Sequence, residues 1–224
     1  MNRVTRFLLV ISTFFLISCE NNMVDDTSNK EISFDSLITL NILGLNLNNQ
    51  GLLDSSFNIF TKIINIDSSF YLAYNNRAMI YTKWKQYDKA FADISYALNN
   101  DTIKHSNYYL NRMNIYIYTK RYAEALDDIN IALEIEDTAE YYKPALSTIY
   151  GKRAECNMQL GNYQESIEDA KLAIHYNPNY YLAYYRRAIA YFELGEKEKA
   201  CKDLLKAKEL GLENIPEELM NKCK

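Results

Sequence analysis

From about residue 37 onward, small side chains recur at a nearly constant spacing within helical patterns. Four of them serve as markers of this spacing: Ala90, Ala125, Ser166 and Ala200. The steps between them are 35, 41 and 34 residues, and an alanine follows each marker seven residues later. Side chains seven positions apart lie on one face of an α-helix, and small ones let a neighbouring helix approach closely. The pattern therefore predicts repeated pairs of antiparallel amphipathic helices.

These pairs divide the chain into units of similar length. The predicted units are 71–104, 106–139, 147–180 and 181–214, with a degenerate unit at 37–70. Residues 140–146 are inserted before the third strong unit, and Pro144 favours a helix that begins near Lys143, because proline is tolerated in a first turn. Pro216 opens a short polar segment, so we predict a capping helix within 215–224.

The best-formed units resemble a known repeat family. LGNYQESIEDAKLAIHYNPN (Leu160 to Asn179) and YYRRAIAYFELGEKEKACKDLLKAKEL (Tyr184 to Leu210) are similar to the tetratricopeptide repeat, a helix–turn–helix unit of about 34 residues. Pro178 falls at that family's inter-repeat proline. The resemblance implies an all-α fold, a right-handed superhelical solenoid of about five such units with a short C-terminal capping helix. It implies protein binding but identifies no partner.

The first residues have the pattern of a targeting segment. Arg3 and Arg6 precede the apolar run Phe7 to Ile17, which is shorter than the roughly 20 residues of a membrane span. The run ends in Leu16-Ile17-Ser18-Cys19, which resembles a bacterial lipoprotein signal. We expect 1–18 to be removed, Cys19 to be acylated, and 19–36 to form a flexible tether; an ordinary secretion signal or an uncleaved anchor are the alternatives. Glu20 after the cysteine favours the outer membrane of a Gram-negative bacterium, facing the periplasm or the surface.

Composition excludes several classes of function. The formal charge is −4, and no basic block follows the first six residues, so we expect no nucleic-acid partner. His105 and His175 are the two histidines, and neither they nor the cysteines have metal-site or catalytic spacing. We therefore expect no enzyme activity, cofactor or metal. Cys156 is predicted to be a buried thiol, and Cys201 and Cys223 could form a disulfide or remain free.

An arginine recurs in the first helix of each strong unit, within YNNRAMIY, YLNRMNIY, YGKRAECN and YYRRAIAY. An aspartate follows each arginine sixteen residues later, which gives the pairs Arg77 and Asp93, Arg112 and Asp128, Arg153 and Asp169, and Arg187 and Asp203. The degenerate unit has Leu43 and Ile59 at these two positions and lacks both partners. We predict a guanidinium–carboxylate contact in each unit; a ligand-binding stripe of arginines is the alternative.

The positions beside these arginines are the candidate partner-binding groove, because first helices line the groove in arrays that the chain resembles. The predicted groove residues are Asn76, Met79, Lys83, Asn107, Asn111, Asn114, Tyr118, Lys152, Glu155, Tyr185, Arg186 and Ile189. This polar and aromatic surface suits an extended peptide or a partner helix; a simple solvated helix face is the alternative. The sequence thus predicts a membrane-anchored, protein-binding scaffold. An assembly factor for an outer-membrane or pilus complex, or a module that captures glycans or peptides, remain alternatives.

Overall fold

The computed structural model describes residues 33–136 and 143–224. Eleven helices and no strands form within these two ranges, which confirms the all-α prediction. In chain order they are α2 (Phe34–Asn49), α3 (Leu53–Ile66), α4 (Tyr71–Lys83), α5 (Tyr87–Asn100), α6 (Ser106–Tyr118), α7 (Tyr122–Glu136), α8 (Lys143–Gln159), α9 (Tyr163–Tyr176), α10 (Tyr181–Glu193), α11 (Lys197–Glu209) and α12 (Glu217–Asn221).

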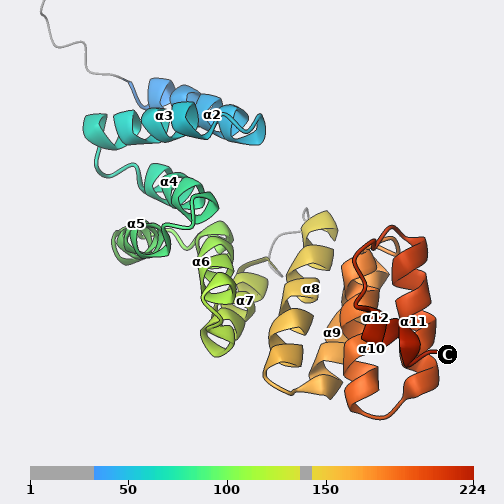
Figure 1. The fold of residues 1–224 in the computed structure, drawn as a ribbon. Coiled ribbons are helices and arrows are strands. Elements are labelled where there is room, and N and C mark those ends of the chain that lie inside the picture. The colour runs from blue at the N-terminus through green and yellow to red at the C-terminus, as the bar shows by residue number, and fades with distance from the viewer. Residues whose placement is uncertain (1–32, 137–142) are drawn as a thin grey trace, which may run out of the picture. The chain divides into compact units, whose positions relative to one another are not determined.

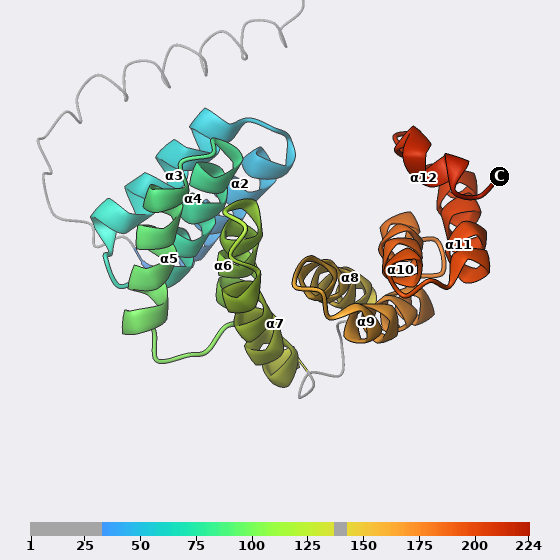
Figure 2. The same cartoon turned by 60° about the horizontal axis from the view of Figure 1, so that its bottom comes forward.

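Residues 37–224 form one compact unit built from consecutive helix pairs. In it α4 packs on α5, α6 on α7, α8 on α9 and α10 on α11, and neighbouring pairs are in contact. Figure 1 shows the two helices of such a pair joined by a short turn, and Figure 2 shows the same pairs from another side. The first helix of each pair is the one that carries the arginine.

The marker residues lie at the contact between the two helices of a pair, as the spacing predicts. Ala90, Ala125 and Ala200 are fully buried, and so is Ser166. The Ser166 hydroxyl donates a hydrogen bond to the carbonyl of Ala154 at 2.8 Å. Its burial therefore leaves no unpaired polar group at this close approach.

The degenerate first unit uses the same arrangement. Ser56 on α3 donates its hydroxyl to the carbonyl of Gly44 on α2 at 2.8 Å. A Cβ added to Gly44 would lie 2.5 Å from Cε1 of Phe60, which is fully buried. The two helices of this unit therefore approach closely at Gly44, as those of the third strong unit do at Ala154.

The turn after each first helix contains one residue in the left-handed backbone conformation. This residue is Gly51, Lys85, Lys120, Gly161 or Gly195, with φ between 59° and 80°. After α4, the Gln86 amide donates to the carbonyl of Tyr81 at 2.8 Å, and the Lys85 amide donates to that of Thr82 at 2.9 Å. These bonds satisfy carbonyls that the helix end leaves free.

Two helix starts that the prolines predict are present in the structure. The predicted helix start near Lys143 and the predicted capping helix after Pro216 are confirmed by α8 and α12. A disulfide joins Cys201 on α11 to Cys223, with their Cα atoms 5.4 Å apart, so these two thiols are paired and not free.

Among the described residues, no helix has the length and apolar character needed to span a membrane. The predicted signal peptide, Cys19 and the predicted tether up to residue 32 lie outside the described residues. Helix α2 begins at Phe34, inside the range predicted as a tether.

Candidate functional site

An asparagine ladder connects the first helices of the first three pairs. Nδ2 of Asn76 on α4 donates to Oδ1 of Asn41 on α2 at 2.7 Å. Nδ2 of Asn75 donates to Oδ1 of Asn76 at 3.3 Å, and Nδ2 of Asn111 on α6 donates to Oδ1 of Asn75 at 3.0 Å. Asn76 is only 5% exposed. We therefore revise its interpretation from a partner-contacting residue to an internal contact between successive first helices.

A charged version of this contact links α8 to α10. Nη2 of Arg186 donates to Oε2 of Glu155 at 2.5 Å, and Nζ of Lys152 donates to the same oxygen at 3.2 Å. Nη1 of Arg186 also donates to the hydroxyl of Tyr180 at 3.3 Å, and the arginine is 7% exposed. Like Asn76, Arg186 is therefore committed to neighbouring helices, although sequence reasoning placed it on the groove surface.

Five of the predicted groove residues meet in one cavity between α4 and α6. Its volume is about 180 Å³, and its lining residues are Met79, Thr82, Lys83, Asn111, Asn114 and Tyr118. Lys83 is held by its Nζ, which donates to Oδ1 of Asn48 on α2 at 2.5 Å. Tyr118 is 59% exposed, and its ring stacks on that of Tyr87 with centroids 5.9 Å apart. The cavity thus offers amide groups, an ammonium group and a positioned aromatic ring to a ligand.

The remaining groove predictions lie apart from this cavity. Asn107 is exposed in the first turn of α6, and Tyr185 and Ile189 are half-buried on α10. Burial raises the pKa of the Tyr185 phenol above its ordinary value. These three residues therefore mark helix faces without forming a common site.

All four predicted arginine–aspartate contacts are present. The shortest nitrogen–oxygen distances are 2.7 Å for Arg77 and Asp93, 2.6 Å for Arg112 and Asp128, 2.6 Å for Arg153 and Asp169, and 2.6 Å for Arg187 and Asp203. Each guanidinium also lies 5.2–5.7 Å from the ring of the tyrosine three residues earlier. The hydrogen bonds to Asp128 hold the pKa of Arg112 above its ordinary value. The arginines therefore brace the two helices of each pair, and the alternative of a ligand-binding stripe is not supported.

Comparison with known proteins agrees with this construction. Residues 71–99, 147–180 and 181–210 match the model of the tetratricopeptide repeat. The chain contains tetratricopeptide repeats. It is 38% identical over 69 residues to the Hsp70/Hsp90 co-chaperone CNS1 of Saccharomyces cerevisiae, a match that spans 31% of this chain and only 17% of the co-chaperone.

Two solved structures share the tetratricopeptide-repeat fold over most of the chain. One is pilF of Pseudomonas aeruginosa, with a TM-score of 0.70 and 18% identity over 80% of this chain and 78% of that one. The other is YrrB, described as a TPR protein with an unusual peptide-binding site, with a TM-score of 0.63 and 18% identity over 82% of this chain and 88% of that one. At this identity the likeness establishes the fold alone.

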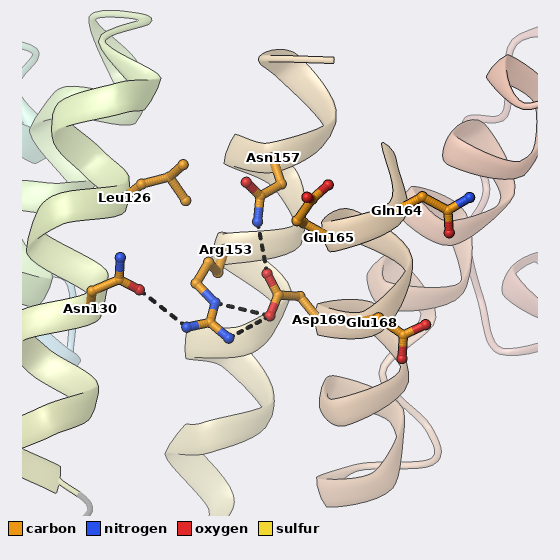
Figure 3. Close-up of a pocket in the computed structure, with 8 residues that line it drawn as sticks. All are labelled: Leu126, Asn130, Arg153, Asn157, Gln164, Glu165, Glu168 and Asp169. Atoms are coloured by element: carbon orange, nitrogen blue, oxygen red, sulfur yellow. Dashed lines mark hydrogen bonds and ion pairs between the residues drawn. The ribbon is translucent and has the colours of Figure 1, made fainter. Parts of the chain in front are cut away.

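The third strong tetratricopeptide repeat departs from the others around its arginine. Nε and Nη2 of Arg153 both donate to Oδ1 of Asp169, at 2.9 and 2.6 Å, and Nδ2 of Asn157 donates to Oδ2 at 2.9 Å (Figure 3). Nη1 of Arg153 donates to Oδ1 of Asn130 on α7 at 3.1 Å. Burial raises the pKa of Asp169 and outweighs these hydrogen bonds, which lower it. This network lines a second cavity, between α7, α8 and α9, which sequence reasoning missed.

Metal binding finds no support in the part of the chain that the structure describes. No group of three or more His, Cys, Asp and Glu side chains there could hold an ion. Cys156 is fully buried, and burial raises the pKa of its thiol to about 12.

Proposed function

We propose that the chain is a membrane-anchored scaffold that binds an extended peptide segment of a partner protein in the cavity between α4 and α6. Tetratricopeptide repeats are protein-interaction scaffolds, and the co-chaperone CNS1 carries a segment similar to this chain. The observation that carries the proposal is the gathering of Met79, Asn111, Asn114 and Tyr118 around one cavity.

The size of the cavity favours a peptide over a small molecule. Small-molecule sites have volumes of roughly 300–1,000 Å³, whereas this cavity measures about 180 Å³. It can therefore accept a single side chain of a longer ligand, which lies along the first helices on either side. A glycan would need a larger cavity than this one, so a peptide is the better-supported ligand between α4 and α6.

The chemistry of the lining suggests how the peptide is held. Nδ2 of Asn111 donates to Asn75 and Nδ2 of Asn114 to the carbonyl of Leu110. The side-chain oxygen and the second N–H of each amide can pair with a peptide backbone, which offers both donors and acceptors. Met79 supplies a flexible apolar surface, and the exposed ring of Tyr118 supplies contact area at a low entropic cost. Lys83 adds a positive charge, so a peptide with an acidic residue beside the inserted side chain is favoured.

A peptide-display selection tests this proposal. The purified protein would be used to select peptides from a random 12-residue library, and the affinity of each selected peptide would be measured by fluorescence anisotropy. We expect Tyr118→Ala and Asn114→Ala each to weaken binding about tenfold, the loss of roughly 1.4 kcal/mol of contact energy. Asn58→Ala, an exposed asparagine on α3, is the matched control and should bind normally. Selected peptides whose affinity survives both cavity variants would refute the proposed site.

Membrane anchoring is the second part of the proposal and rests on the Leu16-Ile17-Ser18-Cys19 motif. Acylation at Cys19 would place the array at a membrane surface, with the segment before α2 as the connection. Metabolic labelling with an alkyne analogue of palmitate should label the wild-type protein, and Cys19→Ala should abolish both the label and sedimentation with membranes. A labelled Cys19→Ala protein would contradict the anchor without affecting the peptide site.

A further inference from the structure

Aromatic pairs fill one recurring position between neighbouring repeats. The ring of Tyr81 on α4 lies edge-on to Phe57 on α3, with centroids 5.3 Å apart. The ring of Tyr116 on α6 lies edge-on to Phe91 on α5, with centroids 5.6 Å apart. In both cases the tyrosine is four residues after the arginine, and the phenylalanine directly follows a small buried residue of the preceding unit, Ser56 or Ala90.

These tyrosines also cover one face of each arginine. The guanidinium of Arg77 lies 5.6 Å from the ring of Tyr74 and 5.9 Å from that of Tyr81. A planar cation is stabilised by an aromatic face on each side. The same arrangement recurs around Arg112, with Tyr109 at 5.7 Å and Tyr116 at 5.8 Å.

The third strong repeat lacks both members of the aromatic pair. Asn157 takes the position of the tyrosine and Leu126 that of the phenylalanine. Arg153 keeps its first ring, Tyr150, at 5.2 Å, but its other neighbour is now the short Asn157. Asn157 and Leu126 have less side-chain volume than the tyrosine and phenylalanine, and both line the cavity of about 480 Å³ in Figure 3.

The surroundings of this cavity form a fixed site. Arg153 is held by Asp169 and Asn130, so its guanidinium is positioned before any ligand arrives. Figure 3 shows Leu126, Asn157 and Glu165 on one side of the guanidinium, whereas Glu168 on α9 points away from it. Both glutamates are exposed.

We infer that this cavity receives an aromatic side chain, preferably tyrosine, from a partner protein, and that basic residues flank that side chain. The ring would occupy the place that Tyr81 and Tyr116 occupy in their own repeats, against Leu126 and the Arg153 guanidinium. The exposed carboxylate of Glu165 favours a positive charge on the neighbouring residues of the partner, whereas that of Glu168 is already paired with Lys171 at 2.6 Å. This site is separate from the cavity between α4 and α6, so a negative result at either site leaves the other proposal unaffected.

The test uses three short probes with the full chain. Acetyl-Lys-Tyr-Lys-amide, acetyl-Lys-Ala-Lys-amide and acetyl-Glu-Tyr-Glu-amide would be titrated into ¹⁵N-labelled protein at low salt. We expect the first probe to shift the Arg153 Nε–Hε and Asn130 side-chain signals in a saturable manner at millimolar concentration. The alanine probe should bind at least tenfold more weakly, and so should the acidic probe. An alanine probe that binds as well as the tyrosine probe would overturn the aromatic assignment, and an equally tight acidic probe would overturn the charge preference.

The decisive variant is Asn157→Tyr, which installs the residue that the other strong repeats carry. It should place a ring in the cavity beside Arg153, preserve the helical circular dichroism spectrum, and weaken binding of the tyrosine probe at least tenfold. Asn58→Tyr, the same change on an exposed face of α3, is the matched control and should leave binding unchanged. Leu126→Phe provides a second route to the same result if Asn157→Tyr fails to fold. Undiminished binding of the tyrosine probe by a folded Asn157→Tyr or Leu126→Phe protein would refute the site. A wild-type dimer that Asn157→Tyr dissociates would also refute it, because a second copy of the chain would then be the occupant.

Discussion

The Arg112–Asp128 pair allows a direct test of the idea that the recurrent arginines brace the fold. Oδ1 of Asp128 accepts a hydrogen bond from Nη2 of Arg112 at 2.6 Å, and Oδ2 accepts one from Nε at 2.8 Å. The aspartate side chain is 2% exposed and that of the arginine 22%. Asp128→Ala would therefore remove the carboxylate and leave a guanidinium between two helices without its counter-charge.

The expected loss follows from this burial. Removing one partner of a buried ion pair costs about 3–5 kcal/mol, because the remaining charge has lost its compensation. Since part of the Arg112 guanidinium reaches water and its two tyrosine rings remain, we expect the lower end, about 3 kcal/mol. That is a large part of the ~5–15 kcal/mol stability of a typical domain.

Urea unfolding of the purified protein, followed by circular dichroism and by the fluorescence of Trp84, would measure this loss. Glu124→Ala is the control on the same helix, because it breaks the exposed Arg121–Glu124 pair and should change stability within experimental error. Replacing both partners by apolar residues, Arg112→Met with Asp128→Leu, should recover most of the loss, since no charge is then stranded. If Asp128→Ala unfolds at the same urea concentration as Glu124→Ala, the bracing role is wrong.

Three further predictions concern the turns and the thiols. The Cys201–Cys223 disulfide closes a loop across 22 positions, so Cys223→Ser should lower the unfolding free energy by roughly 3 kcal/mol. The urea midpoint of this variant should not respond to dithiothreitol. A variant with the wild-type midpoint would contradict a stabilising role of the disulfide. Cys156 is fully buried with a pKa of about 12, so iodoacetamide at pH 8 should label it in urea and not in buffer, as peptide mass spectrometry can show. Lys120 has a φ of 60°, and the corresponding turn of the next repeat has Gly161 at this position. Lys120→Gly should therefore raise the thermal midpoint by an amount equivalent to about 0.5–1 kcal/mol, and a lower midpoint would count against backbone strain at Lys120.

Much of the helical framework could be predicted because it depends on short-range spacing. Small residues seven apart must share a helix face, so the buried positions Ala90 and Ala97 were already visible in the sequence. The sixteen residues from Arg77 to Asp93 cross the connection between the two helices of one repeat. The joint absence of both partners in the first unit indicated that the two residues form a pair. The structure confirms that prediction with a contact of 2.7 Å.

The groove could be predicted only in part, because its inner edge depends on contacts between repeats. Helical phase placed Asn111, Asn114 and Tyr118 on one side of α6, and in the structure they line a cavity with residues of α4. The same phase could not show that Asn76 reaches the preceding first helix, 35 residues earlier in the chain. Distances between repeats are set by packing along the array, and a single repeat carries no record of them.

The cavity at Arg153 depends on both kinds of information. The sequence already contained half of the signal, because YGKRAECN ends in asparagine where the other three stretches end in tyrosine. Asn157 alone would be read as one tolerated substitution in a degenerate repeat pattern. Its meaning changes once α7 is placed beside α8, since Leu126 then proves to be the smaller partner at the same junction. Two small side chains, beside a guanidinium that hydrogen bonds hold in place, line a defined cavity. A structural defect would be expected to have lost the arginine or the aspartate as well.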